Sequence, residues 1–186
     1  MSLYPTTRSG LELPAKIRLS GARQARRFGL LTAIAAVCCG ALLAGGAREP
    51  APKFLAKALD GEVFSNQSLQ GKVVLVQFWA TWCHYCRQDQ EAVDALVQDF
   101  AASGLVVLAV NVGESKKKVK QYLGQSPRAC KIVLTEDTNL AALYAATAYP
   151  RYVLIDRHGD IAGQQNGAAG EAALRHLLAK AGLDSE

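Results

Sequence analysis

The chain has 186 residues and a formal net charge of +5, and half of its residues are hydrophobic. A chain of this length holds one ordinary domain, with or without an appendage, and excludes a large multidomain assembly. Residues 1–47 contain six basic residues and one acid, whereas residues 48–186 contain 15 basic and 15 acidic residues. Because the excess positive charge is confined to the leader, the sequence offers no basic surface on the folded part, and we expect no nucleic-acid partner.

Residues 28–47 form an apolar run without charges, which follows several arginines. At about 1.5 Å per residue, a helix of this length reaches about 30 Å, enough to cross the hydrocarbon core of a bilayer. The positive-inside rule then leaves residues 1–27 in the cytoplasm and residues 48–186 outside it. The run is either a transmembrane anchor in the inner membrane or a cleaved signal segment. In both cases we expect the folded part in the bacterial cell envelope, in an oxidising periplasm or extracytoplasmic space.

The exported part alternates between strand-like and helix-like segments. Apolar, β-branched runs indicate strands that are buried on both faces, and apolar residues spaced three and four apart indicate helices. This alternation favours a central sheet with helices on both of its faces. The expected elements are, in chain order, a hairpin over 54–64 with its turn at Asp60-Gly61, a strand over 73–79, a helix over 84–102, a strand over 105–112, a helix over 115–123 with Ser115 as its N-cap, a strand over 131–134, a helix over 138–146, a hairpin around 157–159 and a helix over 170–181.

Two cysteines, Cys83 and Cys86, open the helix that follows the buried strand over 73–79. Unpaired backbone N–H groups at a helix N-terminus favour a thiolate over a thiol, and a spacing of two residues brings both sulfurs within disulfide reach. We therefore expect an exposed Cys83 to attack a disulfide of a partner and Cys86 to resolve the mixed disulfide. A positive charge on His84, beside the pair, would further favour the thiolate of Cys83. A structural zinc site would need a second pair of ligands, so we expect neither a metal nor a cofactor.

The segment QFWATWCHYC resembles the active-site segment of the thioredoxin superfamily. Residues 52–182, including SLQGKVVLVQFWATWC, LAVNVGES and AYPRYVLIDRHGDI, resemble the membrane-tethered TlpA/ResA/DsbE-like branch with its redoxin (AhpC/TSA-type) domain. The resemblance implies an α/β, thioredoxin-like fold: a central mixed β-sheet flanked by helices, with an extra N-terminal β-hairpin. It also implies an extracytoplasmic thiol–disulfide oxidoreductase that reduces disulfides of exported proteins such as apocytochrome c. Such a protein would receive electrons from a membrane protein and act as a monomer.

In that family a cis-proline packs against the cysteine pair, and Pro150 stands at the matching position. The resemblance therefore implies a cis bond between Tyr149 and Pro150, with Tyr149 beside the disulfide. It also implies that Trp82, Tyr149 and Pro150 contact the substrate chain. An ordinary trans proline at the entry to a strand is the alternative, since only about 5% of X–Pro bonds are cis.

Cytoplasmic thioredoxins carry a buried aspartate where this chain has Gln77, which cannot titrate. Glu114 matches a glutamate of the ResA-like branch that lies near the cysteine pair. We expect Glu114 to accept the proton that Cys86 loses before it attacks the mixed disulfide, with a raised pKa if the side chain is buried. The alternative is a solvated acid at the start of the helix over 115–123.

Four points leave alternatives open. Tyr85 precedes the second cysteine, where members of the family commonly have proline, so both a reductase and an oxidase remain compatible with the motif. Cys130 is either a buried apolar residue or a thiol that pairs with another chain. A thiol peroxidase shares the redoxin domain, although ATWC (residues 80–83) lacks the Thr-x-x-Cys spacing of that class. A copper-handling protein of the same fold would use CxxxC and a distal histidine rather than CxxC.

Overall fold

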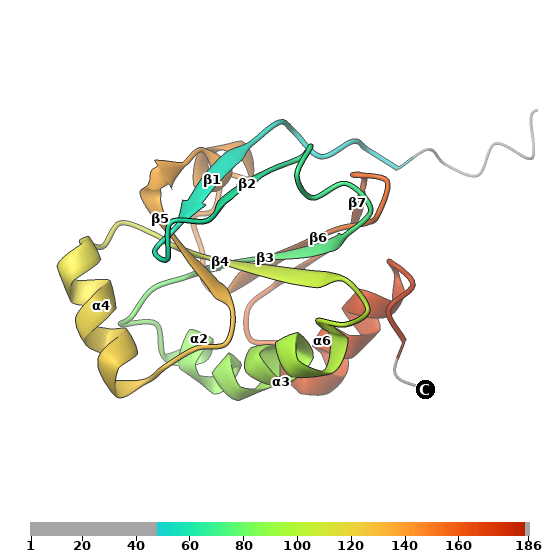
Figure 1. The fold of residues 1–186 in the computed structure, drawn as a ribbon. Coiled ribbons are helices and arrows are strands. Elements are labelled where there is room, and N and C mark those ends of the chain that lie inside the picture. The colour runs from blue at the N-terminus through green and yellow to red at the C-terminus, as the bar shows by residue number, and fades with distance from the viewer. Residues whose placement is uncertain (1–47, 185–186) are drawn as a thin grey trace, which may run out of the picture. The chain divides into compact units, whose positions relative to one another are not determined.

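The computed structural model describes residues 48–184, and Figure 1 shows the ribbon of this part. The expected cytoplasmic segment (1–27) and the expected anchor or signal segment (28–47) lie outside the described residues. Between residues 48 and 184, none of the helices has the length and the apolar composition of a membrane span.

A seven-stranded sheet forms the centre of the fold, in the order β2-β1-β5-β4-β3-β6-β7. β3 and β5 both run parallel to β4, whereas the other neighbouring pairs are antiparallel, so the sheet is mixed as expected. The strands are β1 (Leu55–Ala58), β2 (Val63–Ser65), β3 (Val73–Trp79), β4 (Leu105–Asn111), β5 (Lys131–Thr138), β6 (Arg151–Ile155) and β7 (Ile161–Asn166).

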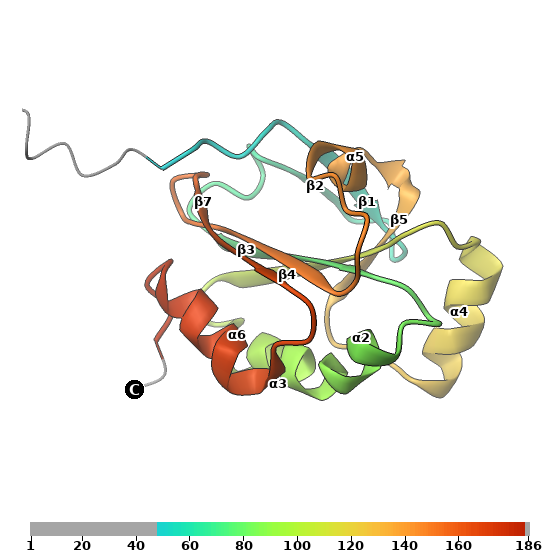
Figure 2. The same cartoon turned by 180° about the vertical axis from the view of Figure 1, so that it is seen from behind.

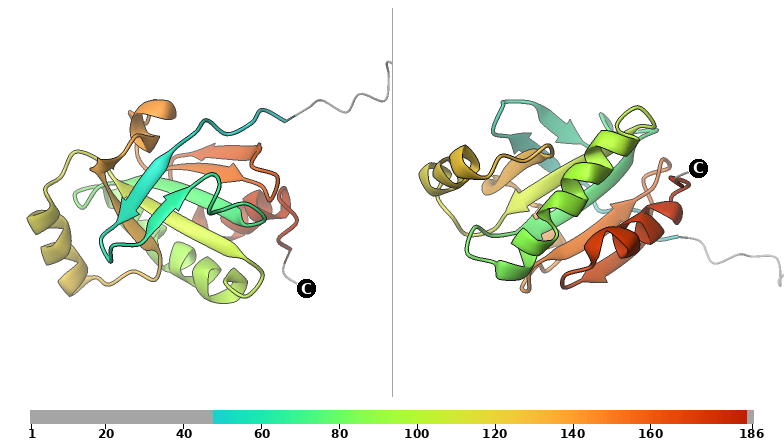
Figure 3. Two further views of the ribbon diagram at one scale, coloured as in Figure 1. Left: turned by 45° about the horizontal axis from the view of Figure 1, so that its top comes forward. Right: turned by 90° about the horizontal axis from the view of Figure 1, so that it is seen from below.

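Helices cover one face of the sheet more completely than the other. α3 and α6 lie side by side on one face, and α2 leads into α3 (Figure 1, Figure 3). The short α5 lies on the opposite side, close to the N-terminal hairpin (Figure 2). The helices are α2 (His84–Gln88), α3 (Gln90–Phe100), α4 (Lys116–Gln125), α5 (Leu140–Leu143) and α6 (Gly170–Ala179).

The central strand β3 is buried along its whole length, and its side chains alternate between two hydrophobic clusters. Leu75 and Trp79 belong to the cluster that contains the apolar residues of α3 and α6. Val76 and Phe78 belong to the cluster on the opposite face, which includes Leu140 of α5. Burying a large apolar side chain contributes about 1.5–3 kcal/mol. An unbroken apolar run such as VVLVQFW therefore belongs in the middle of a sheet that is covered on both faces.

The expected order of strands and helices is confirmed, including both hairpins and the N-cap at Ser115. The single helix expected over 84–102 is wrong, because Asp89 separates α2 from α3. The carboxylate of Asp89 accepts hydrogen bonds from the backbone N–H groups of Ala169 and Gly170, each at 2.9 Å. A segment about 80 residues away in the chain therefore stabilises the break between α2 and α3. The spacing of apolar residues along the helix does not reveal such a distant partner.

The strand expected over 131–134 extends to Thr138, and the helix expected over 138–146 contracts to α5. The cause is the N-terminal hairpin, because β1 pairs with the extended part of β5 and places Ala56 opposite Thr138. Pairing with β1 thus satisfies the backbone N–H and C=O groups of the end of β5, so this segment stays extended and the helix starts later.

Candidate active site

Residues that the sequence analysis expected to act together reach the same edge of the sheet. β3 and β4 run parallel and end at Trp79 and Asn111, so the segments that follow them start side by side. The first of these segments carries the cysteine pair and the second carries Glu114. β6 runs antiparallel to β3 and begins at Arg151, so Pro150 enters the sheet at this edge as well.

Cys83 and Cys86 form a disulfide at the first turn of α2. Cys83 is the N-cap residue, and its sulfur accepts a hydrogen bond from the backbone N–H of Cys86 at 3.1 Å. A thiolate at Cys83 would meet this same N–H and the positive end of the helix, and both stabilise negative charge. The expected exposure of Cys83 is wrong for the disulfide form, because only 5% of the residue is accessible to solvent.

Two exposed aromatic side chains lie close to the cysteine pair in the sequence. Trp82 is 63% exposed and Tyr85 is 59% exposed, and they flank Cys83 in the chain. The ring of Trp82 meets the ring of Tyr149 edge-on, with centroids 6.1 Å apart. The bond between Tyr149 and Pro150 is cis, which confirms that expectation. Exposed aromatic ring surface therefore lies beside Cys83 in the chain.

The carboxylate of Glu114 binds the turn that leads from β3 to the cysteine pair. Its oxygens accept hydrogen bonds from the backbone N–H and the hydroxyl of Thr81, both at 2.6 Å. The side-chain amide of Asn111 donates a third bond at 2.8 Å. Lys118, one turn further along the chain, adds an ion pair at 2.6 Å, and the side chain of Glu114 remains only 4% exposed. The side chain of Glu114 is therefore buried and links the turn at Thr81 to the end of β4. It is not the solvated acid of the alternative interpretation.

The expected raised pKa of Glu114 is wrong. Burial by itself raises this pKa, but the hydrogen bonds from Lys118, Thr81 and Asn111 together stabilise the carboxylate more strongly and hold the pKa at about 2. A carboxylate that stays ionised at neutral pH, with both oxygens occupied by donors, is a weak proton acceptor. The geometry of Glu114 supports a role in holding the turn at Thr81.

Comparison with known proteins agrees with this geometry. Residues 46–178 match the profile of the Redoxin family. The chain belongs to the redoxin family. It is 26% identical over 132 residues to the thiol-disulfide oxidoreductase ResA of Halalkalibacterium halodurans, a match that covers 71% of this chain and 75% of that relative. It is 36% identical over 115 residues to the thioredoxin-like protein YneN of Bacillus subtilis, covering 61% of this chain and 67% of that relative.

Solved structures agree with the fold of this redoxin. A thiol:disulfide interchange protein of the thioredoxin family from Chlorobium tepidum TLS matches it with a TM-score of 0.65 at 27% identity, covering 74% of this chain and 99% of that structure. The expected thioredoxin-like fold is thus confirmed. This redoxin is a thiol–disulfide oxidoreductase with Cys83 and Cys86 as its CxxC pair, and its substrates are protein thiols and disulfides. Within residues 48–184, no three His, Cys, Asp or Glu side chains are grouped as metal ligands.

The structure adds two residues to the site that the sequence analysis missed. Thr81 and Asn111 are the donors that bind Glu114, and Asn111 is fully buried at the end of β4. The sequence held one signal for this arrangement, since a polar residue that closes the apolar run LVVLAVN needs a buried partner.

A second polar group missed from the sequence surrounds Gln77 in the redoxin interior. Gln77 is fully buried in β3, and its side-chain amide bonds the hydroxyl of Tyr152 at 3.1 Å and the guanidinium of Arg128 at 2.6 Å. The hydroxyl of Tyr152 in turn donates to the carboxylate of Asp89 at 2.8 Å. Burial raises the pKa of Tyr152, and the nearby negative charge of Asp89 raises it further, so the phenol stays protonated at neutral pH.

Cys130 is a free thiol and is 7% exposed, just before β5. Burial raises the pKa of this thiol, while the positive charge of Arg128 acts in the opposite direction. The expected buried position is confirmed. Because the thiolate is the reactive form of cysteine, the raised pKa disfavours chemistry at this residue.

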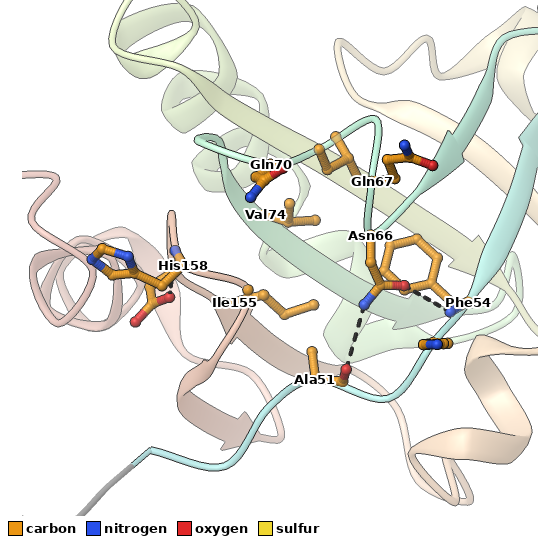
Figure 4. A pocket seen from close by; sticks show the side chains of 12 residues that line it. Ala51, Phe54, Asn66, Gln67, Gln70, Val74, Ile155 and His158 are labelled. Carbon is orange, nitrogen blue, oxygen red and sulfur yellow. Dashed lines mark hydrogen bonds between the residues drawn. The ribbon is translucent and has the colours of Figure 1, made fainter.

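A cavity of about 350 Å³ lies at the other end of the sheet from the cysteine pair (Figure 4). Val74 near the start of β3 and Ile155 at the end of β6 line it, whereas the disulfide follows the end of β3. Asn66 braces its wall by accepting a hydrogen bond from the N–H of Phe54 and by donating to the carbonyl of Ala51. The cavity is therefore separate from the redox site, and its Asn66 side chain supports the fold of the N-terminal segment.

Proposed function

We propose that this redoxin works outside the cytoplasm of a bacterial cell. In this proposal residues 48–186 are the exported domain, residues 28–47 are a membrane anchor or cleaved signal segment, and residues 1–27 stay in the cytoplasm. The apolar run after a basic leader supports it. The compartment is also one in which protein disulfides form and need exchange. We infer that the clients are exported proteins with cysteine pairs, such as apocytochrome c, that a membrane protein supplies electrons, and that the domain acts as a monomer.

The observation that carries the proposed reaction is the disulfide of Cys83 and Cys86 at the start of α2. In the reducing direction, the thiolate of Cys83 attacks one sulfur of a client disulfide. A mixed disulfide forms, and the other client sulfur leaves as a thiolate and takes up a proton. Cys86 then loses its proton and attacks the sulfur of Cys83, which closes the Cys83–Cys86 disulfide and releases the second client thiolate. Two electrons pass to the client, and the donor protein restores both thiols by the reverse exchange.

The surrounding residues receive roles in the same proposal. Trp82, Tyr149 and Pro150 form the surface that contacts the client chain, which the exposure of Trp82 and its packing on Tyr149 support. Glu114 acts as a positioning residue, because it fixes Thr81 two residues before Cys83. It leaves the proton of Cys86 to solvent or to the client.

A redox titration of the full chain tests the reaction and its direction. The alkylation state of the peptide that carries Cys83 and Cys86 would be read by mass spectrometry after equilibration with glutathione buffers. A reversible two-electron couple at about −230 mV or lower supports the reductase, whereas a couple at about −150 mV or higher supports a disulfide donor. The absence of a reversible couple would refute exchange at this pair. Rapid consumption of hydrogen peroxide by the reduced chain would instead support a thiol peroxidase.

Labelling in intact bacterial cells tests the compartment. A maleimide that does not cross the inner membrane should label Cys83 in cells that express the full chain, after brief treatment with a reductant. The double variant Cys83→Ser/Cys86→Ser provides the matched control for labelling of other thiols. Labelling that appears only after the cells are lysed would contradict the proposed export.

A further inference from the structure

A chain of hydrogen bonds crosses the interior of the domain next to the cysteine pair. The guanidinium of Arg128 donates to the side-chain oxygen of Gln77 at 2.6 Å. The side-chain nitrogen of Gln77 donates to the hydroxyl of Tyr152 at 3.1 Å, and this hydroxyl donates to the carboxylate of Asp89 at 2.8 Å. Gln77, Tyr152 and Asp89 are each at most 2% exposed. Four side chains from four separate regions of the sequence thus form one continuous path.

The direction of every bond in this path is forced by chemistry. A guanidinium only donates, so the oxygen of the Gln77 amide faces Arg128 and the nitrogen faces Tyr152. The phenol accepts from that nitrogen and therefore gives its own hydrogen to Asp89. All donors point the same way, from a cation at one end to a carboxylate at the other. In a buried setting such aligned bonds polarise and strengthen one another.

One end of the path closes the redox helix, and the other lies over an aromatic ring of the hydrophobic cluster that contains the cysteines. Asp89 closes α2 three residues after Cys86 and also accepts the N–H groups at the start of α6. At the other end, the guanidinium of Arg128 lies over the ring of Trp79, with 4.7 Å to the ring centroid. Trp79 belongs to the same hydrophobic cluster as Cys83 and Cys86. The path therefore connects the end of the CxxC helix to the packing beneath the disulfide.

We propose that Arg128 is a positioning residue for the redox pair, which acts through Gln77 and Tyr152 on Asp89. It anchors the end of α2 and brings a positive charge to the interior side of the cysteines. Both effects stabilise the reduced pair, because a nearby cation and a fixed helix favour the thiolate. The inference rests on disulfide exchange at Cys83 and Cys86 and is independent of export and of the client. The charged and titratable groups on the elements around the pair are Asp89 at the α2–α3 junction, Tyr152 of β6, Arg128 before β5, the Glu114–Lys118 pair after β4, and His84 and Arg87 of α2.

The test compares Arg128→Met with Arg128→Lys in the full chain. Methionine keeps an unbranched stem over Trp79 but removes the charge and the donors, whereas lysine keeps the charge and one donor to Gln77. Arg175→Met is the matched control, because the guanidinium of Arg175 also lies over an aromatic ring, Phe100, at 5.5 Å. The readouts are the equilibrium with glutathione, measured on the peptide that carries the cysteine pair, and the pH dependence of Cys83 alkylation.

For Arg128→Met we expect the equilibrium constant to shift toward the disulfide by about three- to tenfold, which equals a potential lower by about 15–30 mV. The alkylation profile of Cys83 should move to higher pH. Arg128→Lys should retain most of the wild-type behaviour, and Arg175→Met all of it. A folded Arg128→Met chain with an unchanged potential and profile would overturn the inference and leave the exchange reaction intact. A wild-type chain without a reversible couple would overturn both.

A second variant keeps the test decisive if Arg128→Met does not fold. Tyr152→Phe breaks the path in its middle while both charged ends remain, so it should move the potential in the same direction by a smaller factor. The near-ultraviolet circular dichroism of each variant reports whether its core is intact. An unchanged potential in a folded Tyr152→Phe chain would show that Asp89 does not depend on this path.

Discussion

Replacement of Glu114 by glutamine separates the two roles that a buried acid near a cysteine pair can have. Glutamine keeps one oxygen, which can accept from the N–H of Thr81 and from the amide of Asn111. Its NH₂ group can donate to the hydroxyl of Thr81, which rotates to accept. The ion pair with Lys118 is lost, together with the charge on every remaining bond. The turn before Cys83 should therefore persist with weaker support.

The magnitude follows from the lowered pKa of Glu114. A pKa of about 2, against the ordinary 4.5, corresponds to at most about 3–4 kcal/mol of stabilisation at neutral pH. Because glutamine recovers neutral hydrogen bonds, we expect the free energy of unfolding to fall by about 1–2 kcal/mol at pH 7. A depressed carboxyl pKa stabilises the fold above its unfolded value and loses this effect as the pH falls through the folded value. The difference between the two chains should thus be constant above about pH 5 and should vanish between about pH 4.5 and pH 2.

Two measurements check this reasoning. Urea unfolding at several pH values gives the stability difference, and the rate of exchange with a disulfide-bonded peptide from pH 5 to pH 9 gives the mechanism. We expect the rate of Glu114→Gln to stay within about threefold of wild type, with a pH profile of the same shape. A loss of about 100-fold, the scale of a missing general base, at unchanged stability would refute the positioning role. Glu136→Gln, at an exposed acid of β5, is the matched control.

Three other variants probe the site. Cys86→Ser removes the resolving thiol, so Cys83 should form a stable mixed disulfide with a disulfide-bonded peptide, visible as added mass under non-reducing conditions; rapid turnover by this variant would contradict the assigned order of attack. Trp82→Ala removes a ring that is 63% exposed, so the free energy of unfolding should change by less than about 0.5 kcal/mol while kcat/KM for a protein client falls several-fold; an unaltered kcat/KM would remove Trp82 from the client surface. Lys118→Met takes away the cation paired with Glu114, so the pKa of Glu114 should rise from about 2 toward 4.5 and acid unfolding should begin at higher pH; NMR titration of the carboxyl group checks the direction, and a constant pKa would disprove it.

The parts of the fold that depend on local pattern could be predicted from the sequence. The run VVLVQFW has no polar residue except Gln77, so its burial on both faces follows from composition alone, and the structure confirms it. The prediction of a cis bond before Pro150 rests on the resemblance to the thioredoxin superfamily, and the structure contains this cis bond. Base rates for proline would have given the opposite answer.

The parts that depend on distant partners could not be predicted. Asp89 interrupts the helix because it binds N–H groups about 80 residues later, which no periodicity reveals. The pKa of Glu114 depends on a balance between burial and donors, and Thr81 lies 33 residues before it in the chain. The sequence distinguishes Gln77 only by the aspartate that it replaces, because its partner Arg128 lies outside any recognisable motif.

The pairing of the N-terminal segment also determines which strand edges of the sheet are free to pair with another polypeptide. β1 covers the free side of β5, so that end of the sheet is β2, a strand of only three residues. At the other end, the backbone of Glu49 and Ala51 bonds to the chain at the start of β7 and occupies part of that edge. Short or occupied edges hinder the addition of foreign strands, which is the first step of edge-to-edge aggregation. The edges of this sheet are thereby protected from the addition of a client polypeptide as a further strand.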